Sequence, residues 1–337
     1  MKIFTVFFAI LILISSCATT SSRAPVWMTN IEADFPSSKY LAAVGSGSSR
    51  RRAQKDAAAF LAQQFTVNVK VDTIAQQKYA ELVKEDKNYT ESEIILSHII
   101  GTQASEEFIN LKFSDAYTDK SGTTFVVAYI ERQPTALIYR DIITKDLAKA
   151  EEYYNRANSA TGSLRRYAFY DAAYTVGLNA ERMIDQLRII YSPMATIAAM
   201  DLNLRKFAEA RDREAGNLSY SISITGDNDG RVAAIIRDTM SEQLISYSPA
   251  GKMVIRGTWA LSPISVNPSF KSVQWTTDIS FFDEANTTIT TFYKDARENG
   301  ITEDQAEIFA YREFQRHFSA EMTNGIQSYL TGIVVGR

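Results

Sequence analysis

Residues 272–282 read SVQWTTDISFF, and this stretch decides the fold class. Polar side chains alternate with apolar or β-favouring ones, which are Val273, Trp275, Thr277, Ile279 and Phe281. Successive side chains of a strand point to opposite faces of its sheet, so the stretch predicts a strand with one buried and one solvated face. A sheet of such strands is covered by helices on one side only.

The neighbouring segments repeat the pattern and supply the helices. Strands are predicted for LSYSISIT (218–225), KMVIRGTWAL (252–261) and TTITTFY (287–293), with DEAN (283–286) as a turn. Asp229 is expected to cap a helix over about 230–245. Thr302 and Gln305 form a capping box for a last helix, whose apolar stripe includes Phe314 and Phe318. Residues 216–337 are therefore predicted to form one α+β unit.

The first part of the chain shows a similar order of elements. KYLAAVG (39–45) predicts a strand, the spacing after Arg50 predicts a helix, and FTVNVKVDT (65–73) predicts a second strand. Residues 73–104 are ambiguous, with a short helix from Thr90 as one interpretation. Two further strands are predicted around a turn at 119–122. Helices are expected at 137–157, 164–190 and 194–214, and Pro193 marks the end of the second.

These patterns predict an α+β protein with two two-layer α/β sandwich modules, in which each sheet has its helices on one face. The modules cover residues 25–132 and 216–337, and a helical connector over 133–215 joins them. Each module follows the order strand, polar loop, helix, three strands and helix.

The N-terminus carries the features of an export signal. Residues 1–16 contain a short basic start and an apolar run from Phe4 to Ile14, which is typical of a signal peptide and too short to span a membrane. Ile14-Ser15-Ser16-Cys17 resembles a bacterial lipobox, which implies cleavage before Cys17 and acylation of that residue, including a palmitate-type chain. An ordinary signal peptide is the alternative. Residues 17–24 would then be a lipidated tether.

Composition excludes several classes of protein. Cys17 is the only cysteine, so no disulfide within the chain can stabilise the fold. The chain has 36 Lys and Arg against 39 Asp and Glu, so there is no basic excess that would indicate nucleic-acid binding. No other stretch is apolar and long enough to predict a membrane span.

The loop GSGSSRRR (45–52) resembles a phosphate-binding loop at first sight. A dinucleotide fingerprint needs glycine where Arg50 stands, and a P-loop needs a Gly-Lys-Ser/Thr ending that is absent. The structural interpretation is that Gly45 and Gly47 allow close approach or unusual backbone angles, while Ser48 or Ser49 caps the helix. Cations at a helix N-terminus are unfavourable, which keeps an anion site as an alternative. Its candidate residues are Ser46, Gly47, Ser48, Ser49 and Arg50.

Other candidate chemistry is sparse. The chain has two histidines, His98 and His317, both in apolar surroundings, and no common zinc-site spacing. GDNDG (226–230) lacks the acidic ends of a calcium loop and predicts a capped turn. Asp283 and Glu284 are expected to be solvated turn residues. We therefore predict no cofactor, no metal and no catalytic residues, with a carboxylate-dependent hydrolase as the remote alternative.

The first unit resembles the Lpp-twenty family of bacterial lipoproteins and the related N-terminal domain of the flagellar assembly protein T. The resemblance rests on Pro25-Val26-Trp27, on Tyr40-Leu41 through Gly45-Ser46-Gly47, and on Ala53, Ala57 and Leu61. It covers roughly the first third of the mature chain and implies a protein of the cell envelope. The second unit lacks the Pro-x-Trp entry.

The sequence thus predicts a lipid-anchored envelope lipoprotein that acts as a binding or assembly module. Ala18 rather than aspartate follows Cys17, which favours the outer membrane, with the protein facing the periplasm. Gln274, Thr276 and Asp278 on the polar sheet face are the candidate partner surface. The expected partner is an envelope protein or peptidoglycan. The alternative is a receptor for cell-wall glycan or a small anion at residues 45–52.

Overall fold

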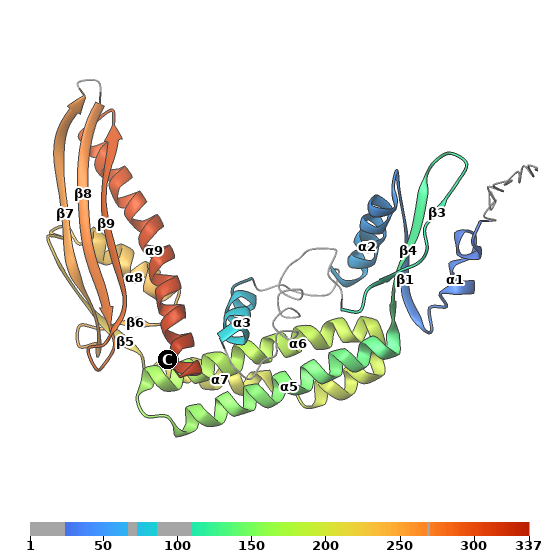
Figure 1. Ribbon diagram of the computed structural model, residues 1–337. Helices are drawn as coiled ribbons and strands as arrows, with labels where there is room; N and C mark the ends of the chain where they lie inside the picture. The colour runs from blue at the N-terminus through green and yellow to red at the C-terminus, as the bar shows by residue number, and fades with distance from the viewer. Residues whose placement is uncertain (1–23, 67–72, 86–108, 268–269, 337) are drawn as a thin grey trace, which may run out of the picture.

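The computed structural model describes 24–66, 73–85, 109–267 and 270–336 of the chain. Two units containing β-sheets stand at opposite ends of a long helical bundle and rise from the same side of it (Figure 1). This arrangement is the predicted α+β fold, in which sheets pack against helices. The labels of helices and strands below follow Figure 1.

The first unit is built around an antiparallel pair of strands. Its elements are η1 (Val26–Met28), α1 (Ile31–Asp34), β1 (Tyr40–Gly47), α2 (Arg50–Thr66), α3 (Thr73–Glu85), β2 (Lys112–Phe113), β3 (Tyr117–Thr118) and β4 (Thr124–Glu131). β4 pairs with β1 along its whole length and with the short β2 and β3. The predicted hairpin at 119–122 joins β3 to β4. Trp27 of the Pro-x-Trp entry is buried.

The predicted strand FTVNVKVDT is only partly covered by the structure. Phe65 and Thr66 belong to α2, and 67–72 lie outside the described residues, as does the helix predicted from Thr90. The ambiguous segment that begins at Thr73 is helical as far as Glu85.

The connector is a three-helix bundle. α5 (Arg132–Ser159) and α6 (Ser163–Met200) run antiparallel, and α7 (Leu204–Ala215) packs on α6. Tyr191, just before Pro193, has non-helical angles (φ −154°, ψ 87°), so α6 is two helices joined by a sharp kink. The predicted end of the second helix near Pro193 is therefore confirmed. The single helix predicted over 194–214 is wrong, because residues 201–203 interrupt it and Asn203 caps α7 through a bond from the Lys206 N–H (3.2 Å).

The second unit has a five-stranded sheet in the order β6-β5-β7-β8-β9. Its elements are β5 (Ser219–Thr225), α8 (Arg231–Ser241), β6 (Ser246–Tyr247), β7 (Met253–Asn267), β8 (Phe270–Phe282), β9 (Thr288–Gly300) and α9 (Glu303–Val335). β5 and β7 are parallel, whereas β7, β8 and β9 form an antiparallel meander. The first sheet instead pairs β1 with its last strand, so a similar order of elements does not give the same strand pairing.

Helix caps follow the expected chemistry with one correction. Thr302 accepts a hydrogen bond from the Gln305 N–H (3.2 Å), and Gln305 Oε1 accepts one from the Ile301 N–H (2.7 Å), which confirms the capping box. Asp227 rather than Asp229 supplies the main cap of α8, because its carboxylate accepts from the N–H groups of Val232 and Ala233. Gly230 has φ +72° and directs the chain into the helix.

The apolar side chains form two cores, and the bundle contributes to both. Near the first unit, Leu41 and Leu61 share a core with residues on the nearby half of the bundle, including Tyr139, Ile143, Met183 and Leu187. The other half of the bundle packs into the core of the second unit through Ala150, Tyr153, Phe169 and others. α3 precedes β2 in the chain, yet its Tyr79, Leu82 and Val83 belong to this second core.

Candidate functional site

The second sheet has one covered and one open face. α8 and α9 lie on the covered face, where Val273, Trp275, Thr277, Ile279 and Phe281 are all 0% exposed (Figure 1). Burying each large apolar side chain contributes about 1.5–3 kcal/mol, which fixes the register of the strand. Gln274 and Asp278 point to the opposite face and are exposed, and Thr276 is half-buried there. The predicted alternation is confirmed, while the partner role of these residues stays a prediction.

The open face extends beyond the three predicted residues. Gln274 Nε2 donates to Asp295 Oδ1 across to β9 (2.9 Å). Asp278 lies between Thr258 of β7 and Tyr293 of β9, and Tyr293 is 62% exposed. Sequence reasoning missed Tyr293, because a tyrosine in a strand is usually a packing residue. Tyr293 lies two residues from both Thr291 and Asp295, so all three side chains point to the same face of the strand. This spacing is the signal that could have identified Tyr293 as an exposed residue.

The loop after β1 is tightly built. A Cβ on Gly45 would lie 2.0 Å from the Ala57 backbone nitrogen and 2.4 Å from the Ala53 carbonyl oxygen, so α2 touches the strand there. Gly45 and Gly47 are not among the glycines with positive φ, and therefore close approach explains them. Ser49 caps α2, because its Oγ accepts from the Arg52 N–H (3.4 Å).

Polar groups of this loop already bond to one another. The Ser46 N–H donates to Asp56 Oδ2 (2.9 Å), and the Arg52 guanidinium donates to Ser48 Oγ (2.7 Å). The Asp56 carboxylate therefore occupies the Ser46 N–H, and its negative charge would repel an anion approaching this loop. Arg50 and Arg51 are exposed. These contacts favour the structural interpretation of the loop, and the anion site stays a prediction.

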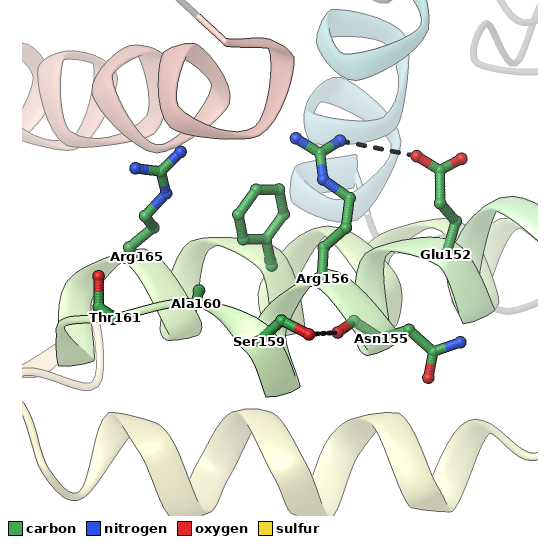
Figure 2. A pocket seen from close by; sticks show the side chains of 8 residues that line it. Glu152, Asn155, Arg156, Ser159, Ala160, Thr161 and Arg165 are labelled. Carbon is green, nitrogen blue, oxygen red and sulfur yellow. Dashed lines mark hydrogen bonds and ion pairs between the residues drawn. The ribbon is translucent and has the colours of Figure 1, made fainter.

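A hollow that the sequence did not predict lies where α5 turns into α6. Two adjoining cavities of about 620 and about 580 Å³ share Thr161 and Arg165. Figure 2 shows Arg156 and Arg165 extending from the end of this hairpin in the same direction. The guanidinium carbon of Arg156 lies 4.4 Å from the ring centroid of Phe169, and Glu152 pairs with it at 3.6 Å. Asp283 and Glu284 line the second cavity, so the hollow as a whole carries both charges and does not indicate one kind of ligand.

A buried polar network fastens α3 to the bundle. The Tyr79 hydroxyl donates to both carboxylate oxygens of Asp146 (3.0 and 3.2 Å), and Asn179 Nδ2 donates to Asp146 Oδ2 (2.7 Å). Arg182 Nη2 donates to Asn179 Oδ1 (2.6 Å), and burial lowers the pKa of this arginine to about 10. Asp146 is 1% exposed, so these partners are required to satisfy its charge. The network is structural, since it connects three helices.

The remaining polar candidates have structural partners. Asp283 Oδ1 accepts from the N–H groups of Ala285 and Thr287 in the β8–β9 turn, and Tyr329 donates to Asp283 Oδ2 (2.9 Å). His317 is half-buried, 3.5 Å from Glu313. His98 and Cys17 lie outside the described residues. Within the described ranges, no three His, Cys, Asp or Glu side chains gather closely enough to hold a metal ion.

Comparison with known proteins identifies the first unit. Residues 25–131 match the LPP20 lipoprotein family. The Lpp-twenty resemblance of the Pro-x-Trp and Gly-x-Gly pieces is thereby confirmed over this range, and it supports a lipoprotein of the cell envelope. No curated protein matches the chain.

Among the solved structures that match the chain are two bacterial proteins. One is a minor lipoprotein from Acinetobacter baumannii, with 15% identity, a TM-score of 0.26, and coverage of 33% of this chain and 92% of that one. The other is a secreted protein from Helicobacter pylori, with 12% identity, a TM-score of 0.42, and coverage of 85% of this chain and 98% of that one.

In the segments that the structure describes, no helix is both long and apolar enough to cross a bilayer.

Proposed function

We propose that this protein is a lipoprotein anchored through acyl chains on Cys17 to the bacterial outer membrane, with its folded part in the periplasm, where it binds or assembles with an envelope protein or peptidoglycan. The match of residues 25–131 to a lipoprotein family supports the anchor. Several acyl chains, at about 0.8 kcal/mol for each buried CH₂, would make membrane attachment stable.

The open face of the second sheet is the observation that carries the binding role. Hydroxyl, amide and charged side chains from four strands are exposed on it, namely Ser223, Arg256, Thr258, Gln274, Asp278, Thr291, Tyr293, Asp295 and Arg297. The buried side chains beneath hold the strands in place, so a partner need not order this surface on binding. A broad polar face can form hydrogen bonds with a partner without the aggregation that an apolar face invites.

Other functions have less support. The loop at residues 45–52, considered as a receptor site for glycan or a small anion, has its Ser46 N–H bonded to Asp56. The paired acids Asp283 and Glu284, considered for a hydrolase, lie in a turn that Asp283 holds together. Binding or assembly without catalysis remains the proposal that fits the polar groups best.

The anchor is tested by mass spectrometry of the protein purified from membranes. The mature chain should begin at Cys17 and carry added acyl mass, and Cys17→Ala should lack that acyl mass. A chain that starts at another residue, or an unmodified Cys17, would refute lipid anchoring.

The binding face is tested by capturing partners from crosslinked cell envelopes. The double variant Thr276→Arg/Asp278→Arg should lose captured partners while its circular dichroism spectrum stays that of the wild type. Gln315→Arg/Glu321→Arg is the matched control, because it adds the same charge at two exposed positions of α9, on the other side of the unit. If the double variant captures the same partners as the control, the open face is only solvated.

A further inference from the structure

The second sheet has two very different edges. One edge is β6, which has only two residues (Ser246–Tyr247), and the other is β9, which has 13 (Thr288–Gly300). Among the described residues, β9 pairs with β8 alone (Figure 1). A long edge strand leaves a row of backbone N–H and C=O groups available to another strand, and proteins usually shorten or block such edges.

Charged side chains are grouped in the second half of this edge strand. Residues 294–298 read KDARE, with Ala296 at the centre. Lys294 and Glu298 are half-buried towards α9, whereas Asp295 and Arg297 are exposed on the open face. Within the part of the chain that the structure describes, none of the four forms a close ion pair, and the side-chain bond of Asp295 is to the neutral Gln274. On the covered side, Glu298 lies near Trp275 and Arg316, and Lys294 lies near Glu313.

The order of these charges is self-complementary. If two copies of β9 pair antiparallel with Ala296 opposite Ala296, Lys294 faces Glu298 and Asp295 faces Arg297, each pair occurring twice. Opposite charges directly across an antiparallel pair are stabilising, and like charges are destabilising. The nearest alternative registers that keep the same side chains on each face are shifted by two residues. One of them places Asp295 opposite Asp295, and the other places Arg297 opposite Arg297. The sequence therefore favours one register and opposes its neighbours.

We propose that β9 pairs with β9 of a second copy of this chain, antiparallel and centred on Ala296. The contact is isologous, because the same strand serves both copies around a two-fold axis. The pairing keeps both open faces on one side and both α9 helices on the other, so one sheet continues through the dimer. Asp295 and Arg297 also belong to the open face, but self-association is measured on the purified chain alone, so its outcome does not depend on the partner that the face binds.

A protective role for these charges is the competing explanation, since charged residues on an edge also prevent pairing. Protection needs only repulsion, which a single type of charge would give in every register. The mixed order Lys-Asp-Ala-Arg-Glu attracts in the register centred on Ala296, and this is the observation that favours a second copy.

Disulfide trapping on the membrane-anchored chain tests the register. Cysteines at the centre of an antiparallel pair lie about 4.5–5.5 Å apart between Cα atoms, which suits a disulfide. Ala296→Cys should therefore form a covalent dimer under mild oxidation. Asn299→Cys should not, because position 299 faces Tyr293 of the other copy, and the wild type controls for Cys17. Equal trapping at both positions, or none at Ala296→Cys, overturns the proposal.

Charge exchange tests the pairs themselves, with sedimentation velocity of the full chain in detergent. Asp295→Arg and Arg297→Asp each convert two attractive pairs into repulsive ones, so each should weaken self-association about tenfold or more. The double variant Asp295→Arg/Arg297→Asp should restore it. A mixture of the two single variants should also form dimers, because the charges of one complement those of the other.

The mixture also separates lost pairing from lost folding, since misfolded variants would not recover on mixing. A monomeric wild type at tens of micromolar, or single variants that associate as well as the wild type, would show that β9 does not pair in this way.

Discussion

Replacing Gly45 with alanine tests the contact between β1 and α2. The new Cβ would lie 2.0 Å from the Ala57 nitrogen and 2.4 Å from the Ala53 oxygen, well inside normal contact, and both are backbone atoms that no side-chain rotation can move. The helix must therefore retreat from the strand. This also loosens Ala53, Ala57 and Leu61, which are all 0% exposed. Overpacking of a core costs about 1–3 kcal/mol, and we expect Gly45→Ala to lie at the upper end, about 3 kcal/mol.

Hydrogen exchange with mass spectrometry is the suitable assay, because the chain has two cores and a single global transition is not assured. Peptides from β1, β4 and α2 should exchange about 100-fold faster, since 1.4 kcal/mol corresponds to a factor of ten. Peptides from β7 to β9 should be unchanged.

Two further glycine variants serve as comparisons for Gly45→Ala. Gly216→Ala is the control, because its nearest atom would be 3.4 Å from the new Cβ, and it should leave exchange near wild type. Gly47→Ala should have a smaller effect than Gly45→Ala, because its closest contacts, Arg52 Cβ at 2.6 Å and the Ala53 nitrogen at 2.9 Å, overlap less than the 2.0 and 2.4 Å contacts at Gly45. If Gly45→Ala exchanges like Gly216→Ala, the close approach of strand and helix does not explain the glycine.

Three other outcomes follow from the structure. Asp146→Ala should weaken the contact of α3 with α5 and α6 by about 3 kcal/mol, measured as faster hydrogen exchange of peptides from these helices, because it removes the acceptor that buried Tyr79 and Asn179 share, and Tyr79→Phe should cost about 1 kcal/mol; equal effects would contradict the network. Tryptophan emission should be blue-shifted and poorly quenched by iodide, because Trp259 is 4% and Trp275 is 0% exposed; strong quenching would contradict this burial. Burial raises the pKa of Tyr220 and Tyr329 to about 12, against 10.0 in an unfolded chain, so the folded state holds these protons to higher pH. The free energy of unfolding should therefore be unaffected below about pH 10 and fall as the pH rises through about 12, more steeply than in Tyr329→Phe; an identical slope would contradict the assignment.

The sequence by itself determined the local elements and the facing of the second sheet. Strict alternation in SVQWTTDISFF specifies which side chains are buried, because a strand has a period of two and only one face can meet the helices. Thr302 and Gln305 identified the start of α9, since a capping box involves only adjacent residues. The family of the first unit could also be identified from short local motifs, and the match over 25–131 confirms it.

Nearby residues with similar chemistry were harder to distinguish. Asp227 and Asp229 both precede α8, and the path of the turn between Gly226 and Gly230, both at positive φ, brings Asp227 to the N–H groups of Val232 and Ala233 while Asp229 accepts from that of Arg231. The interruption between α6 and α7 was missed for a related reason, because residues 201–203 lack both proline and glycine, the usual signals of a helix end.

Only the tertiary structure decided which distant groups meet. The contacts of α3 with α5, α6 and α9 join Tyr79 to Asp146 across 67 positions, and no periodicity encodes such a contact. The hollow beside Arg156 and Arg165 likewise depends on how the α5–α6 hairpin meets the second unit. The order of the strands is also decided by the tertiary structure. The charges of KDARE are visible in the sequence, but they lie at a free edge because β9 is the last strand of the sheet. Local patterns record the neighbours along the chain, whereas edges, hollows and buried networks arise from packing between elements.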